Sequence, residues 1–250
     1  GDFSLSVLDV GQGAAYVIQT HQHTLVVDAG ARLEEFDLGQ VVVVPWLQAQ
    51  GVKQLDRLVI THADNDHSGG AGAVLAAYPN SVVQTNASEL FPDRSLSSCE
   101  AGQIWLWDEV KFEVLYPKLT DTAKGNNDLS CVLRVSNAQH SVLLAADAEK
   151  LAEERLEERF GARLQSDVLV VGHHGSQSSS RYPFLKAVQP KLALISNGYR
   201  NRYHHPHPNV LERLKSLQIE YVTTAESGAL RVWFGNDESI PPLVREREVQ

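Results

Sequence analysis

The stretch His62-Ala63-Asp64-Asn65-Asp66-His67-Ser68-Gly69-Gly70 follows the apolar run from Leu55 to Thr61. That run predicts a strand and the small residues over 70–77 predict a helix, so four side chains of metal-ligand type lie in the loop between them. Imidazole nitrogens and carboxylate oxygens around one point suit divalent cations of borderline hardness. Asp66 or Ser68 could instead cap the helix, but two histidines in the same loop favour a metal site.

A pattern of a hairpin ending in aspartate, followed by a strand ending in histidine, occurs twice in the chain. The first hairpin ends at Asp28-Ala29-Gly30 and its following strand leads to His62. The second ends at Asp147-Ala148 and its following strand leads to His173-His174-Gly175-Ser176. The predicted strands cover 15–19, 24–27 and 55–61 in the first copy, and 130–135, 141–145 and 167–171 in the second.

The repeat predicts an α/β (α+β) fold of two pseudo-repeated halves. Their sheets pack face to face, and helices predicted over 38–50, 70–77 and 149–160 lie outside, which makes a four-layer αββα sandwich. Each aspartate and histidine of the repeat comes just after an apolar strand, so we expect these side chains to meet at one rim. There Asp147 could bridge two cations about 3.5–4 Å apart. Asp28 either orients a ligating histidine or closes its hairpin.

These motifs resemble the metallo-β-lactamase superfamily, which has this αββα fold and a dinuclear metal site. Further motifs resemble the C-terminal domain of the ComEC family of DNA-uptake membrane proteins, over about residues 3–235. They are Leu8-Asp9-Val10-Gly11-Gln12-Gly13, Asn126-Asn127-Asp128-Leu129-Ser130-Cys131-Val132-Leu133 and Asn201-Arg202-Tyr203-His204-His205-Pro206-His207-Pro208.

The resemblance implies two metal ions and their ligands. His62, Asp64 and Asp147 would hold one ion, and Asp66, His67, Asp147 and His173 the other, with His174 as the alternative to His173. Asp28 and Ser130 are expected behind the ligands. Asp64 stands where the superfamily commonly has histidine, and the usual histidine of its third motif has no counterpart near Asn127 or Ser130. Oxygen-rich ligation favours Mn²⁺ or Mg²⁺, with Zn²⁺ possible.

Composition limits the classes of protein that the chain fits. It has 250 residues, 43% of them hydrophobic, and a formal charge of −9. This is a globular composition, and no apolar run approaches the roughly 20 residues that span a bilayer. Cys99 and Cys131 could form at most one bridge, and we predict that they are reduced and packed. No pattern indicates an organic cofactor.

The start of the chain indicates a piece of a longer protein. It lacks methionine altogether and begins Gly1-Asp2, so residues 1–2 are expected to be a remnant of excision. We expect a single domain over 3–235 and a peripheral tail over 236–250.

The stretch between Asp167 and Glu212 contains no acidic residue. It carries Arg200 and Arg202 among five basic residues, as well as three tyrosines, which fits a groove for a single-stranded nucleic acid backbone. The alternative is a helix with solvated basic side chains. Candidate substrate-binding residues are Ser176, Arg200, Arg202 and His205, where His205 would bind phosphate or assist the leaving group. The five basic residues are Arg181, Lys186, Lys191, Arg200 and Arg202.

We therefore expect a metal-dependent nuclease that hydrolyses DNA during DNA uptake. Its substrate would be single-stranded DNA, namely the strand that is not transported. The cations would lower the pKa of water, and Asp66 would position that water and accept its proton. The uptake role comes from the resemblance, as do the transmembrane channel portion of the parent protein as a partner and a periplasmic location beside the inner membrane. Two alternatives remain: a small-molecule phosphodiesterase or ester hydrolase of the same fold, and a non-catalytic DNA-binding module.

Overall fold

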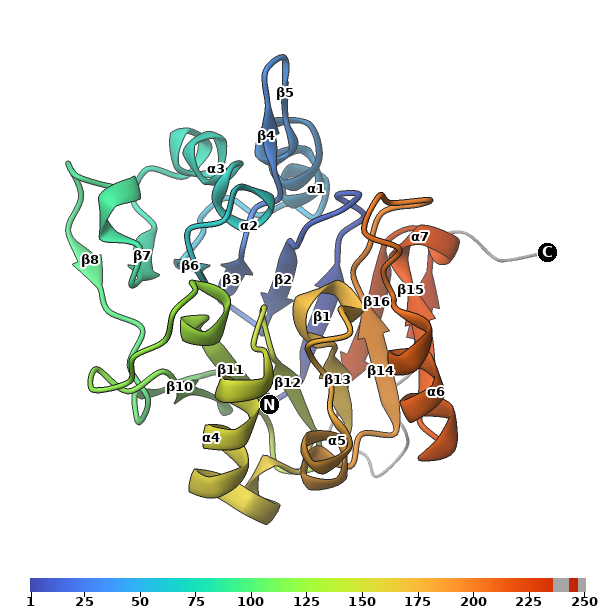
Figure 1. The fold of residues 1–250 in the computed structure, drawn as a ribbon. Helices are drawn as coiled ribbons and strands as arrows, with labels where there is room; N and C mark the ends of the chain where they lie inside the picture. The colour runs from blue at the N-terminus through green and yellow to red at the C-terminus, as the bar shows by residue number, and fades with distance from the viewer. Residues whose placement is uncertain (236–242, 247–250) are drawn as a thin grey trace.

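The computed structural model describes residues 1–235 and 243–246, which form two large sheets and the helices around them (Figure 1). The first sheet has the strand order β17-β16-β1-β2-β3-β6-β7-β8. The strands from β16 to β3 run antiparallel, and β3, β6, β7 and β8 run parallel. The bounds are β1 Phe3–Val7, β2 Tyr16–Gln19, β3 Thr24–Val27, β6 Arg57–Ile60, β7 Val82–Thr85, β8 Leu96–Ser97, β16 Leu230–Phe234 and β17 Leu243–Arg245.

The second sheet has the order β15-β14-β13-β12-β11-β10-β9. Here β9 to β12 run antiparallel, and β12 to β15 run parallel. The bounds are β9 Ile104–Trp107, β10 Val110–Tyr116, β11 Val132–Ser136, β12 Ser141–Leu144, β13 Val168–Val170, β14 Leu192–Ile195 and β15 Glu220–Thr223. A small hairpin of β4 (Arg32–Leu33) and β5 (Phe36–Asp37) projects above the first sheet (Figure 1).

Three apolar cores explain why the sheets and helices stack as layers. The central core joins the inner faces of the two sheets, from Phe3 and Phe234 to Phe112. A second core packs the outer face of the second sheet against α4 (Lys150–Phe160), α5 (Tyr182–Val188) and α6 (Pro208–Ser216). A third packs the outer face of the first sheet against α1 (Val44–Ala49) and α3 (Ala71–Ala77). Burial of apolar area drives each packing.

Shorter helical segments connect these elements. They are the π-helical turn η1 (Gly39–Val43), the short helices α2 (Asn65–Ser68) and α7 (Thr224–Ser227), and the 3-10 turns η2 (Ser88–Leu90), η3 (Asn127–Leu129), η4 (Gly161–Leu164) and η5 (Gly172–Gly175).

The four-layer αββα fold is confirmed, and the repeat is visible in the sheet order. The series β2, β3, β6, β7 in the first sheet has the same directions as β11, β12, β13, β14 in the second. Residues that follow β3, β6, β12 and β13 therefore converge between the two sheets, at the rim that the sequence predicts. The predicted helix over 38–50 is divided into η1 and α1. The one over 70–77 corresponds to α3, and the short helix α2 precedes it in the loop.

The prediction that the cysteines are reduced was wrong, because Cys99 and Cys131 form a disulfide. Their Cα atoms lie 6.0 Å apart, within the range a disulfide spans, and both side chains are buried. The bond joins the segment after β8, in the first sheet, to the residue before β11, in the second. Sequence spacing gave no sign of this pairing, because 32 positions separate the two residues.

The predicted tail over 236–250 contributes β17 to the edge of the first sheet, and residues 236–242 and 247–250 lie outside the described residues. Within the described residues, no helix is both long and apolar enough to cross a bilayer.

Candidate metal centre

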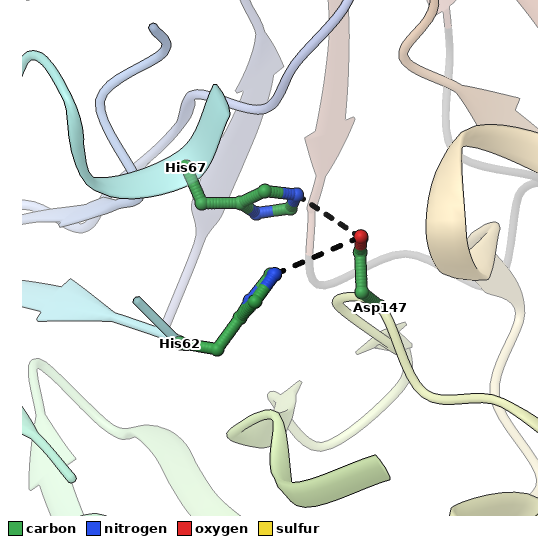
Figure 2. A group of neighbouring side chains, drawn as sticks. All are labelled: His62, His67 and Asp147. Atoms are coloured by element: carbon green, nitrogen blue, oxygen red, sulfur yellow. Dashed lines mark ion pairs between the residues drawn. The ribbon is translucent and has the colours of Figure 1, made fainter. Parts of the chain in front are cut away.

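Asp147 lies at the centre of the polar cluster where the two sheets meet. It is 3% exposed, and each of its carboxylate oxygens faces two histidines. Oδ1 lies 3.1 Å from His67 Nε2 and 3.7 Å from His174 Nε2. Oδ2 lies 3.7 Å from both His62 Nε2 and His173 Nε2. Figure 2 shows His62 and His67 pointing at this carboxylate from the first half of the chain.

All four histidines have Nδ1 engaged and Nε2 directed at Asp147. His67 Nδ1 lies 2.8 Å from Asp28 Oδ2, and His174 Nδ1 lies 3.0 Å from the carbonyl oxygen of Ser196. His173 Nδ1 lies 2.8 Å from Glu149 Oε1. An acceptor at Nδ1 holds the proton there and leaves the Nε2 lone pair free, which is the arrangement of metal-ligating histidines.

His62 reaches the same state through Thr61. Thr61 donates its hydroxyl hydrogen to Asp28 Oδ2 (2.8 Å), so its oxygen accepts from His62 Nδ1 (3.0 Å). Asp28, which is 0% exposed, thus orients His62 through Thr61 and His67 directly. The sequence left two roles open for Asp28, either orienting a ligating histidine or closing a hairpin. These contacts favour the orienting role.

Two acidic side chains complete the groups on either side of Asp147. Asp66 Oδ2 lies 3.3 Å from His174 Nε2 and 4.0 Å from His67 Nε2, on the Oδ1 side. Asp64 Oδ2 lies 3.7 Å from His62 Nε2, on the Oδ2 side. Both carboxylates are partly exposed, so they border solvent while the histidines lie deeper.

The electrostatics of the cluster fit a cation. Burial raises the pKa of Asp147, but the charges of His67 and His174 outweigh it and hold that pKa well below its usual value. Burial lowers the pKa of His67, but Asp147 and Asp28 outweigh it and raise that pKa well above its usual value. These carboxylates favour positive charge at this point, whether a proton or a metal ion supplies it.

His62 gives a second indication that the residues fit a metal ion. Burial and the neighbouring His67 lower the pKa of His62, so this imidazole stays neutral. Its Nε2 is buried and has no hydrogen-bond partner among the described residues. A buried nitrogen without a partner is costly unless an ion or water binds it.

The backbone around the cluster is strained at four residues that are not glycine. Asp28, Ala146, His173 and His174 have φ angles of 59°, 48°, 48° and 55°, in the left-handed region. Each such residue costs of order 1 kcal/mol or more, and such strain gathers at functional sites. Here it turns the two consecutive histidines toward opposite oxygens of Asp147.

The loop containing Ser130 lies behind the Oδ2 side. Asn126 donates to Asp64 Oδ1 over 3.5 Å, and Asn127 Nδ2 lies 3.4 Å from His173 Nε2. Ser130 is fully buried, and its hydroxyl has no partner among the described residues. Ser176 donates its backbone N–H to the His173 carbonyl (2.8 Å), and its hydroxyl is hydrogen-bonded to Ser178, which donates to Glu149 beside the His173 ring.

His205 extends the cluster toward solvent. Its ring lies 5.8 Å from the His173 ring, centroid to centroid, and stacks on Tyr203 at 5.6 Å. Arg202 lies over the Tyr203 ring at 4.8 Å, and Arg200 over the Tyr199 ring at 5.2 Å. Burial, with the charges of His173 and His174, lowers the pKa of His205 to about 4.

The predicted basic groove is smaller than the sequence indicates. Arg181 is paired with Glu153, Glu154 and Glu157 of α4, and Lys191 is paired with Asp167 at the start of β13. Neither cation is free to contact a substrate at the cluster. Arg200 and Arg202 remain at its border.

Sequence reasoning missed Glu149, Asn126 and Gln12. Glu149 follows Asp147 by only two residues, which could have indicated that it lies near the site. We interpreted it as the start of a charged helix. Gln12 lies 193 positions from His205, its partner, so only the fold brings the two together.

The model of the metallo-beta-lactamase superfamily matches residues 8–199. The chain belongs to this superfamily. A crystal structure of the metallo-beta-lactamase fold protein YhfI from Bacillus subtilis shares the fold, with a TM-score of 0.62 and 13% identity, over 89% of this chain and 96% of that one. Membership in this superfamily suggests a metal-dependent hydrolase, and the His/Asp groups of the cluster fit divalent metal ions.

Two bacterial relatives are similar over nearly all of the chain. Recombination protein 2 of Haemophilus influenzae is 36% identical over 94% of this chain, and Competence protein ComA of Neisseria gonorrhoeae is 38% identical over 93%. The resemblance to the ComEC family is thereby confirmed. The chain spans only 29% and 32% of the length of these two relatives.

Proposed function

We propose that this chain is a metal-dependent nuclease that hydrolyses single-stranded DNA during DNA uptake. The observation that supports it most strongly is the carboxylate of Asp147 between two groups of ligand-type side chains. Such a bridge is typical of two-metal phosphodiesterases. Relatives named for competence and recombination favour DNA as the substrate.

Each oxygen of Asp147 would belong to one ion. His62, His173 and Asp64 would hold the first with Oδ2, and His67, His174 and Asp66 the second with Oδ1. The sequence assigned His173 to the second ion, with His174 as its alternative; the distances favour using both, one on each side. Bound ions would lower the pKa of water and neutralise phosphate charge, and Mn²⁺ or Mg²⁺ suits the carboxylate oxygens among the donors.

Asp66 would serve as the base in this reaction. Burial raises its pKa, but the hydrogen bond with His174 and the charges of His67 and His174 outweigh burial and lower it. Asp66 is therefore ionised and partly exposed, able to orient an attacking water and accept its proton. His205, whose ring lies beside that of His173, would contact the phosphate.

Arg200, Arg202, Tyr199 and Tyr203 support a single strand as the substrate. Tyr199 and Tyr203 are 71% and 51% exposed, and each lies against an arginine. Exposed aromatic rings stack on the bases of a single strand, while the guanidinium groups attract its phosphates. Duplex DNA keeps its bases stacked inside the helix, so these tyrosine rings have fewer bases on which to stack.

The parent protein would lie in the inner membrane and present this domain to the periplasm, beside its transmembrane channel. There the domain would degrade the strand that is not transported. The disulfide supports an oxidising compartment, because such bonds rarely persist in the cytosol.

The test is to remove metal with a chelator and add Mn²⁺, Mg²⁺ or Zn²⁺ in turn with end-labelled single-stranded DNA. The variant Asp64→Ala removes one carboxylate of the Oδ2 group, and Asp93→Ala is the matched control because Asp93 is exposed outside the cluster. We expect metal-dependent cleavage that Asp64→Ala weakens strongly and Asp93→Ala leaves intact.

Other outcomes would select the rival functions. Binding of DNA without cleavage in any metal would indicate a DNA-binding module. Hydrolysis of a small phosphodiester such as bis(p-nitrophenyl) phosphate, with DNA left intact, would indicate a small-molecule hydrolase.

A further inference from the structure

Gln12 lies in the Gly11–Ala14 turn after β1 and connects the two halves of the site. Its Oε1 accepts from the backbone N–H of Gly198 (3.1 Å), and its Nε2 lies 3.4 Å from His205 Nδ1. The end of this turn is held from both halves of the chain, because Ala14 donates its N–H to the Asp66 carbonyl and Ser196 donates to the Gly13 carbonyl.

The Gly198 contact orients the Gln12 amide. Only an oxygen accepts from the Gly198 N–H, so the amide group turns its NH₂ toward His205. The two backbone segments also pack closely, since a Cβ at position 198 would approach the backbone nitrogen of Gln12 to 2.8 Å. A donor facing Nδ1 requires the lone pair of His205 there, which leaves the ring proton on Nε2.

His205 is fixed on its other sides. Asn201 accepts from the His205 N–H (3.0 Å) and donates to its carbonyl (2.6 Å), and Asn197 donates to the same carbonyl (3.0 Å). Tyr203 stacks on the ring, and His173 lies at its edge. The four metal-centre histidines have an acceptor or carboxylate at Nδ1, so His205 has the opposite arrangement.

We propose that Gln12 is a positioning residue that holds His205 as the Nε2–H tautomer, so that this imidazole donates a hydrogen bond to a phosphate oxygen of the substrate. The inference rests on the proposed function and assigns His205 one of the two roles left open for it. A neutral imidazole that gave up its Nε2 proton would become an imidazolate, far too basic for neutral water. His205 therefore stabilises charge on the phosphate and does not protonate the leaving group.

The first experiment reads the tautomer directly. Two-bond ¹H–¹⁵N correlation spectra of the whole chain, with His205 assigned by comparison with His205→Gln, report which ring nitrogen carries the proton. We expect an unprotonated Nδ1 and a protonated Nε2. The result should be the same in the absence of metal and with Mg²⁺ added in place of Mn²⁺. A protonated Nδ1 in the unmodified chain would overturn the proposal. This readout needs no substrate, so it stands even if no DNA is cut.

The second experiment separates tautomer control from simple anchoring. Gln12→Glu keeps an acceptor for the Gly198 N–H but places a carboxylate at Nδ1, which moves the ring proton to that nitrogen. We expect kcat on single-stranded DNA to fall on the order of 100-fold, as for loss of a preorganised donor. Gln12→Ala removes the contact with Nδ1 but does not draw the ring proton to that nitrogen, so kcat should fall only about tenfold. Gln48→Glu, an equal change of charge at an exposed position on α1, is the control.

Partial rescue completes the test. His205→Gln retains an N–H near the position of Nε2 and should keep more activity than His205→Ala. Equal activity of Gln12→Glu and the unmodified chain would overturn the proposal. Absence of cleavage by the unmodified chain in every metal would instead overturn the proposed function, and the tautomer measurement would still decide the state of His205.

Discussion

The two halves of the molecule present an aspartate at the same point of the same strand arrangement, yet the two residues do different things. Asp28 comes directly after β3 and faces Thr61 and His67 from behind. Asp147 comes three residues after the end of β12 and lies between four histidines. The connection after β12 is two residues longer than the one after β3 at this point. Asp147 therefore lies at the centre of the site, whereas Asp28 lies behind the histidines. A strand end thus specifies the neighbourhood of a side chain, and the length of the connection specifies its role.

Loss of the central carboxylate should have the largest effect. Asp147→Asn keeps the shape but removes the charge that both ion positions share, so we expect activity to fall by about 1,000-fold or more. Metal content, measured by elemental analysis, should fall with it. Asp93→Asn is the matched control. A variant that retains both ions and most of its activity would contradict a bridging role.

Cutting the covalent link between the halves tests how far they depend on it. Replacing Cys99 and Cys131 by serine removes a closure across 32 positions, and the chain-entropy model then predicts a loss of about 3–4 kcal/mol in the free energy of unfolding. Denaturant unfolding with and without reductant measures it. Because Cys131 follows Ser130 and donates its N–H to the Thr61 carbonyl, metal affinity should fall too. Equal stability of variant and unmodified chain would show that packing alone joins the halves.

The second half also contains a buried acid whose titration should control stability. Glu153 of α4 is 1% exposed and accepts from the backbone of Ser180 and Arg181, in the loop after His173 and His174. Burial raises its pKa to about 8, above the ordinary 4.5. The folded chain thus binds an extra proton between these values, so its stability is fullest below about pH 4.5 and is lost as pH rises through 8.

Glu153→Gln is neutral at every pH and should remove this dependence. Between pH 5 and pH 8 we expect the unmodified chain to lose about 2–4 kcal/mol more than the variant, in urea unfolding at each pH. Glu154→Gln, on the exposed side of the same helix, controls for charge. Parallel pH profiles of the two proteins would refute the prediction.

Asp28→Asn tests the supporting role on the first half. Asp28 Oδ2 accepts from the Thr61 hydroxyl and from His67 Nδ1, while Oδ1 accepts the Thr61 backbone N–H. An amide has only one acceptor oxygen, so its NH₂ group must face a donor at the other position, which breaks the support of Thr61 and of the histidines in front of it. We expect metal affinity to fall about 10- to 100-fold, as for other residues behind metal ligands, measured by competition with a chelator. Asp147→Asn should weaken affinity more. If the two variants were equal, the distinction between centre and support would fail.

The sequence was sufficient to predict the layers, because alternating apolar strands and their repeat determine which faces are buried. It also placed His62, Asp64, Asp66, His67 and Asp147 near one another, since strand ends meet at one rim. The division of His173 and His174 between the two oxygens of Asp147 depends on two left-handed φ angles, which no local pattern encodes. The sequence predicted Arg181 as part of a basic groove, but the fold pairs it with three glutamates of α4, a contact between elements that are distant in the chain.

The smallest expected effect concerns which ion the less buried group prefers. Asp64→His replaces an oxygen by a nitrogen beside His62, and imidazole suits Zn²⁺ better than Mn²⁺. We expect the ratio of Zn²⁺ to Mn²⁺ affinity to rise by about tenfold, or about 1.4 kcal/mol, in competition titrations. Asn65→His is the matched control, since Asn65 contacts Arg32 on the outer side of the same loop. An unchanged ratio would mean that Asp64 lies outside the coordination sphere, and that the group on the Oδ2 side is built from Asp147, His62 and His173 alone.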